Sequence, residues 1–155
     1  MEKLVNVPKE RISIARSCFN RIRKLGVGIE LEDNCCVIDG DAIGVMAAEN
    51  IMRAVGRGFP PEEAFKLEND EITLVVITLP KDGKSLLRIR SRLIGTLGKT
   101  RRTLEQLTGT KICIYGKTAS VIGSYESAEI ATAAIEKLIN GASHKNVYAF
   151  LERLK

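Results

Sequence analysis

The hydrophobic pattern of the chain predicts two long amphipathic helices, one in each half. In the first half, small and apolar residues recur at helical spacing after Asp41, at positions 44, 47, 48, 51, 52 and 55. In the second half, a similar stripe follows Ser124, at positions 131, 134, 135, 138 and 139. A spacing of three and four residues places such positions on one helix face, and Asp and Ser are favoured N-caps. Each half is therefore expected to bury one face of a long helix.

Short runs of apolar and β-branched residues flank these helices and predict strands. The expected strands are Lys3–Pro8, Gly28–Glu32, Cys35–Asp39, Ile72–Leu79, Thr110–Tyr115 and Ala119–Gly123. Helical patterns separate the first and second strands of each half, at Lys9–Lys24 and Lys84–Arg92. A short helix that ends at Leu67 and a last helix from Ser143 to Leu154 complete the expected elements.

The two halves match in element order and spacing, which indicates an internal repeat. Ile29 corresponds to Ile112 and Val37 to Val121, and the offset along the chain varies only between 83 and 85 residues. The acidic segment Glu68–Glu71 lies between the halves and is the best linker candidate. We therefore expect two domains, residues 1–67 and residues 71–155.

A glycine loop in the second half is the strongest candidate for a binding site. The sequence there reads Ile94, Gly95, Thr96, Leu97 and Gly98, followed by a helix that begins with Lys99, Arg101 and Arg102. Glycines let a backbone approach a ligand closely, and a helix N-terminus favours an anion. Cations at that end oppose the helix dipole, so they suit a bound polyanion better than they suit helix stability.

This stretch resembles the KH domain, an RNA- or single-stranded-DNA-binding fold whose GXXG loop clamps about four nucleotides. The matching positions are Ile94, Gly95, Gly98, Leu104, Thr108, Gly109 and Ile112. The resemblance implies an α+β fold of two tandem type I KH domains, each a three-stranded antiparallel sheet with helices packed on one face. Because Arg11–Leu25 contains no glycine, residues 1–67 are interpreted as a degenerate KH domain without the GXXG loop.

The predicted RNA-binding residues surround the second loop, where basic side chains gather. Eight Lys and Arg residues face a single acid between Lys81 and Arg102, and the whole chain has a net charge of +5, which favours an acidic partner. Bases would lie between Ile94 with its helix and the strand at Ile112–Ile114, while the loop and its cations hold phosphates. The predicted set is Arg88, Arg92, Ile94, Gly95, Thr96, Leu97, Gly98, Lys99, Arg101, Arg102, Ile112 and Ile114.

Several other chemistries lack their required patterns. Three GK[ST] triplets have no upstream glycine at Walker A spacing, and the four cysteines have no C-x-x-C spacing, so they are interpreted as reduced packing residues. His144 has no acid or cysteine at ligand spacing and is expected at the surface. No apolar run approaches 18 residues. We therefore expect a cytoplasmic binding protein with no membrane contact, and neither an enzyme nor a holder of a metal or cofactor.

Further features resemble the archaeal tandem KH-domain ribosome-biogenesis proteins related to eukaryotic partner of Nob-one. They are the degenerate first copy, Gly56–Phe59, Gly98–Arg102 and Val121–Gly123. The resemblance implies binding of single-stranded RNA, namely small-subunit rRNA near its 3′ end, and contact with the Nob-one endonuclease or the alpha subunit of translation initiation factor two. Two alternatives stay open: another tandem-KH RNA-binding factor of transcription or RNA turnover, and a protein-interaction scaffold.

Overall fold

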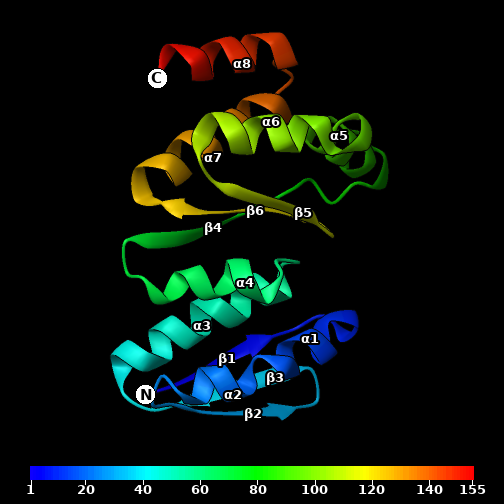
Figure 1. Ribbon diagram of the computed structural model, residues 1–155. Coiled ribbons are helices and arrows are strands. Elements are labelled where there is room, and N and C mark those ends of the chain that lie inside the picture. The colour runs from blue at the N-terminus through cyan, green and yellow to red at the C-terminus, as the bar shows by residue number, and fades with distance from the viewer. The chain divides into compact units, whose positions relative to one another are not determined.

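A computed structural model describes all 155 residues (Figure 1). Its contacts divide the chain into two compact units, Met1–Ile72 and Thr73–Lys155. Each unit contains one three-stranded sheet and its own helices. The expected α+β fold, with two antiparallel sheets and helices packed on them, is confirmed.

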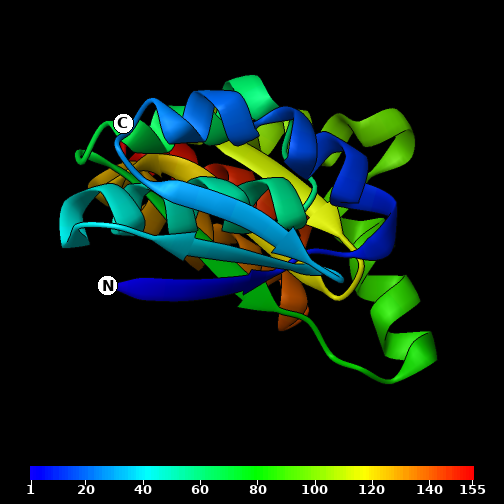
Figure 2. The same cartoon turned by 90° about the horizontal axis from the view of Figure 1, so that it is seen from below.

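The first unit places its helices against a sheet of strand order β1-β3-β2. Its elements are β1 (Glu2–Asn6), η1 (Lys9–Arg11), α1 (Ile12–Ser17), α2 (Phe19–Arg23), β2 (Gly28–Glu32), β3 (Cys35–Asp39), α3 (Ala42–Gly56), α4 (Pro61–Ala64) and η2 (Phe65–Glu68). Both outer strands pair antiparallel with β3, so that Val5 lies opposite Cys36 and Ile29 opposite Ile38. The long helix α3 packs on β1 and β3, and Figure 2 looks onto these strands from below.

The second unit repeats this arrangement with strand order β4-β6-β5. Its elements are β4 (Ile72–Thr78), α5 (Gly83–Ile94), η3 (Thr96–Gly98), α6 (Lys99–Thr108), β5 (Lys111–Tyr115), β6 (Thr118–Ser124), α7 (Tyr125–Ile139) and α8 (His144–Arg153). Figure 1 shows α5, α6 and α7 on one face of this sheet, with α8 beyond them. The strand β5 is therefore an edge strand that lies next to α6.

Helices α3, α5, α7 and α8 each begin with a residue whose side chain caps the first turn. Asp41 accepts a hydrogen bond from Gly44 N at 2.9 Å, and Ser124 accepts one from Ser127 N at 3.2 Å. Asp82 caps α5 and Ser143 caps α8 in the same way. Each cap satisfies one of the free amides of the first turn and is worth about 1 kcal/mol.

The core of the second unit is made of one apolar face from each surrounding element. Leu93 of α5, Leu104 of α6, Ile112 of β5, Val121 of β6 and Ile135 of α7 are all buried in one cluster. This packing fixes α5 and α6 against the sheet on both sides of the glycine loop. The loop is thus a short connection between two anchored helices.

The first unit has a different backbone where the second has its glycine loop. Residues 9–24 run through η1, α1 and α2, with a break at Cys18, and no residue between Lys9 and Leu25 has a positive φ. A basic residue of this segment has a structural role: Arg11 donates from Nε to Val55 O at 3.0 Å and from Nη2 to Phe59 O at 2.7 Å. Its guanidinium therefore holds the end of α3.

Candidate nucleic-acid interface

The glycine loop joins α5 to α6 through three residues with positive φ, Gly95, Leu97 and Gly98. Gly95 ends α5 with φ +75° and ψ 174°, and Gly98 begins α6 with φ +75° and ψ 14°. Between them, Leu97 has φ +54° and ψ 30°, and its side chain is 88% exposed. A non-glycine residue with positive φ costs free energy and is often found at functional sites. An exposed leucine in this conformation contributes nothing to the core.

Two interactions fix the shape of the loop from the side of α6. A Cβ atom on Gly95 would lie only 2.3 Å from Thr100 Oγ1 and 2.7 Å from Thr100 N, so only glycine fits there. Arg102 donates from Nη1 to Leu97 O at 2.6 Å and so holds the carbonyl at the loop tip. Helix α6 has no side-chain cap at Gly98 and its first amide, Lys99 N, donates to Thr96 O, which leaves the other free amides of the first turn for a ligand or solvent.

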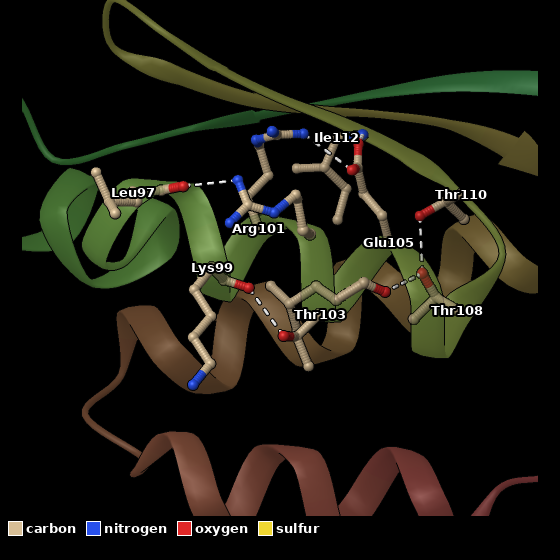
Figure 3. Close-up of polar contacts among 10 residues, drawn as sticks. Leu97, Lys99, Arg101, Thr103, Glu105, Thr108, Thr110 and Ile112 are labelled. Atoms are coloured by element: carbon tan, nitrogen blue, oxygen red, sulfur yellow. Dashed lines mark hydrogen bonds and ion pairs between the residues drawn. The ribbon is translucent and has the colours of Figure 1, made fainter.

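The three cations after the loop differ in what they contact. Lys99 is exposed, and Figure 3 shows its side chain extending away from β5. Arg102 is exposed and holds the loop carbonyl of Leu97. Arg101 is partly buried and forms an ion pair with Glu105, 2.9 Å between Nη1 and Oε1. Lys99 is therefore the cation of this group whose charge has no protein partner.

Glu105 connects α6 to the open edge of β5. One carboxylate oxygen binds Arg101, and the other accepts a hydrogen bond from Ile112 N at 2.8 Å (Figure 3). Since β5 pairs only with β6, and adjacent residues of an antiparallel strand point their backbone groups to opposite sides, the backbone N–H and C=O of Ile114 lie on the same open edge as Ile112 N. This edge can offer one donor and one acceptor to a base.

The predicted apolar contacts are only partly accessible. The Ile112 side chain is 4% exposed and belongs to the core, while Ile94 and Ile114 are half-buried. Ile94 ends α5 immediately before the loop. The structure therefore brings Ile94 and Ile114 to the surface beside the loop and turns Ile112 inward, which limits Ile112 to its backbone.

One predicted RNA-binding residue has its charge directed elsewhere. The guanidinium of Arg92 donates from Nη1 to Leu138 O at 2.6 Å and from Nη2 to Ala142 O, so it caps the end of α7. Its own carbonyl lies 2.9 Å from Nε2 of His144, and the His144 side chain is only partly exposed, so its ring packs against the end of α5. Arg88, one turn earlier on α5, is exposed. The two arginines therefore differ in their contacts: the Arg92 guanidinium is bound to the end of α7, whereas Arg88 faces solvent.

Sequence reasoning did not identify Glu105 as part of the site. The signal available was its spacing from Arg101, since residues i and i+4 of a helix are neighbours. The hydrogen bond to Ile112 N depends on the packing of α6 beside β5 and has no local signal. No group of three or more His, Cys, Asp or Glu side chains could hold a metal ion, and no helix is long and apolar enough to cross a membrane.

Comparison with known proteins identifies the fold of the second unit. Residues 71–155 match the family model for the second KH domain of PNO1, a eukaryotic-type (type I) KH domain. The chain belongs to this KH-domain family. The KH domain-containing protein MJ0443 of Methanocaldococcus jannaschii is 38% identical, over 97% of this chain and 73% of its own length. RNA-binding protein PNO1 of Oryzias latipes is 30% identical over 76% of this chain, which spans about half (51%) of that protein.

Two solved structures match nearly the whole chain. Dim2p from Pyrococcus horikoshii is 37% identical, with a TM-score of 0.91 over 99% of both chains. A second structure from Pyrococcus horikoshii is an a/eIF2alpha-aDim2p-rRNA complex; its matching chain is 36% identical, with a TM-score of 0.90 over 99% of this chain and 93% of that one. The relatives from Methanocaldococcus jannaschii and Pyrococcus horikoshii therefore match this chain over nearly its whole length.

Proposed function

We propose that this KH protein binds single-stranded RNA through its second unit, and that its ligand is small-subunit rRNA near the 3′ end during ribosome biogenesis. The observation that carries the proposal is the loop at residues 95–98, whose tip at Thr96 and Leu97 is exposed, whose Leu97 and Gly98 are left-handed, and which is followed by a helix N-terminus without a side-chain cap. The similarity to an archaeal Dim2p chain crystallised with rRNA supports the same ligand class.

Phosphates bind at the loop and the first turn of α6. Lys99 N donates to Thr96 O, but the first turn of α6 has no side-chain cap, so its remaining free amides can donate to phosphate oxygens, and the positive end of the helix dipole faces the same ligand. Lys99 and Arg88 are exposed and add charge on the two helices that flank the loop. Thr96 and Leu97 are both exposed at the tip, so the sugar-phosphate backbone can reach the loop from solvent.

Bases lie between the loop and the open edge of β5. Ile94 and Ile114 offer half-buried apolar side chains, and the backbone N–H and C=O of Ile114 can bond to a base edge. Aromatic residues make up only 5% of the chain, so stacking platforms contribute little here. Recognition therefore depends on aliphatic contact and on hydrogen bonds to base edges.

The charges of the two units support the proposal that the second one binds the RNA. Residues 73–155 carry 14 Lys and Arg against 6 Asp and Glu, a net charge of +8. Residues 1–72 carry 10 against 13, a net charge of −3. Since affinity for nucleic acid depends strongly on neutralising phosphates, the first unit, which also lacks the loop, is assigned to contacts other than the main RNA site.

The proposed role is that of a binding protein that positions rRNA for other factors. The candidate partners are the alpha subunit of translation initiation factor two, which is present in the archaeal Dim2p–rRNA complex, and the Nob-one endonuclease. The negative charge of the first unit suits a partner with a basic surface. The cytoplasm of the source cell is the proposed location.

Filter binding at a series of salt concentrations tests the proposal. An RNA binder should lose affinity log-linearly with salt, by about 0.7 per phosphate contact for a single strand. Crosslinking in the source cells, followed by sequencing of the attached RNA, should return precursor rRNA from the 3′ end of the small subunit. Recovery of nascent or decaying transcripts would favour the transcription or turnover alternative, and the absence of any salt-dependent binding would favour the scaffold.

A further inference from the structure

The ion pair between Arg101 and Glu105 gives Arg101 a different role from its neighbouring cations. The two side chains are 33% and 15% exposed, so the pair is partly buried. Lys99 and Arg102, on the same first turn of α6, are both exposed. Glu105 is itself fixed, because its second oxygen accepts from Ile112 N at 2.8 Å. The guanidinium is thus held in one orientation beside the edge of β5.

A phosphate is an unsuitable ligand for this guanidinium. Glu105 neutralises the charge of Arg101, so that the pair has no net attraction for an anion. A phosphate bound at Arg101 would also lie within a few ångströms of the Glu105 carboxylate, in a partly buried place where like charges repel strongly. Lys99 and the uncapped amides of α6 provide a better phosphate site at the loop itself.

The pairing leaves the remaining donors of Arg101 for a neutral ligand. Only Nη1 binds Glu105, whereas a guanidinium carries five N–H donors in a rigid plane. Such a fork matches two adjacent acceptors on one base edge. The open backbone edge of β5, with Ile112 N marking its direction, lies next to this fork (Figure 3).

We propose that Arg101, oriented by Glu105, is a specificity-determining residue that selects a base with two adjacent acceptor atoms. These are O6 and N7 of guanine, or O2 and N3 of cytosine. In adenine the N6 donor lies beside N1 and N7, and N3 has no second acceptor next to it; in uracil the N3–H donor separates O2 from O4. Neither base can therefore accept both bonds. This inference rests on the proposed function, since it assigns a base to the RNA site of the second unit.

The test compares Arg101→Gln and Arg101→Lys with the matched control Lys99→Gln. Each protein is titrated with uridine decamers that carry one central guanosine, cytidine or adenosine, at several salt concentrations. Wild type should prefer guanosine or cytidine. Arg101→Lys keeps the charge that neutralises Glu105 and should lose roughly 5- to 150-fold in affinity for that RNA alone, whereas Arg101→Gln also leaves the Glu105 carboxylate unpaired and should lose the preference while weakening all RNAs. The log–log salt slope of Arg101→Lys should stay unchanged. Lys99→Gln should weaken all RNAs equally and reduce the slope by about 0.7.

The outcomes separate the inference from the function beneath it. A reduced salt slope with intact base preference in Arg101→Gln would make Arg101 a phosphate ligand and overturn the inference. Salt-dependent binding without base preference in wild type would overturn the inference and keep the function, and no salt-dependent binding at all would overturn both. Two measurements distinguish the two bases. If guanine is selected, replacing guanosine by 7-deazaguanosine, which lacks N7, should remove the preference for that RNA. If cytosine is selected, wild type should prefer the RNA with the central cytidine.

Discussion

Gly95 lies directly against Thr100, with no space for a side chain between the end of α5 and the first turn of α6. A Cβ atom at Gly95 would lie 2.3 Å from Thr100 Oγ1, and the backbone at φ +75° and ψ 174° belongs to a region used almost only by glycine. The close contact keeps the loop tight over the N-terminus of α6. It therefore links the shape of the candidate phosphate site to one missing side chain.

Replacing Gly95 by alanine should destabilise the second unit by about 2–4 kcal/mol, because overpacking adds to backbone strain. Chemical denaturation followed by circular dichroism measures the loss. The matched control is Gly83→Ala at the start of α5, where an added Cβ meets nothing within 4 Å; it should leave the free energy of unfolding within about 0.5 kcal/mol of wild type. Equal effects at the two positions would contradict the tight loop.

The double variant Thr96→Asp with Leu97→Asp should abolish RNA binding and leave the thermal stability nearly unchanged. Both side chains are exposed, and aspartate tolerates the left-handed conformation of Leu97 better than most residues. Two carboxylates at the loop tip would repel phosphates. The neutral control, Thr96→Asn with Leu97→Asn, should keep most of the affinity in filter binding, and unaltered affinity in the aspartate variant would place the RNA elsewhere.

Substitutions at Arg92 and Arg88 should have different effects, the first on stability and the second on RNA affinity. Arg92→Met removes two hydrogen bonds from a charged donor to the carbonyls of Leu138 and Ala142, and should cost about 2 kcal/mol of unfolding free energy. Arg88→Met removes an exposed charge and should leave stability within about 0.5 kcal/mol while lowering the salt slope of RNA binding. A stable Arg92→Met protein with impaired RNA binding would restore Arg92 to the site.

Local features of the fold, such as hairpin strands and helix caps, could be predicted correctly from the sequence. The hairpin strands Gly28–Glu32 and Cys35–Asp39 have the expected bounds, and the caps Asp41 and Ser124 accept the expected hydrogen bonds. The caps join residues three positions apart, and the hairpin pairs residues no more than 11 positions apart, Gly28 with Asp39, so their chemistry is visible in a short stretch of the chain. The loop at residues 95–98 belongs to the same group.

The hydrogen-bond partners of the long basic side chains could not be predicted from the sequence. Arg92 finds its partners 46 and 50 residues away at the end of α7, and Arg11 finds its own at the end of α3. A count of basic residues near a loop treats such side chains as alike, whereas packing decides which of them face solvent. The same limit applies to His144, whose ring lies against Arg92 O, 52 residues away.

The thiol of Cys36 should make the first unit less stable at alkaline pH. Burial, followed by the nearby Cys35 and Cys18, raises the pKa of Cys36 from 9.0 to about 11, and the side chain is fully buried on β3. Because the folded protein keeps this proton more tightly than the unfolded chain, stability is fully present below pH 9 and is lost as pH rises toward 11. The loss should reach about 2–3 kcal/mol. Urea denaturation of wild type and Cys36→Val between pH 8 and pH 11 measures the difference. The same pH dependence in the two proteins would show that the Cys36 thiol has the same pKa in the folded and unfolded states, and would contradict the prediction.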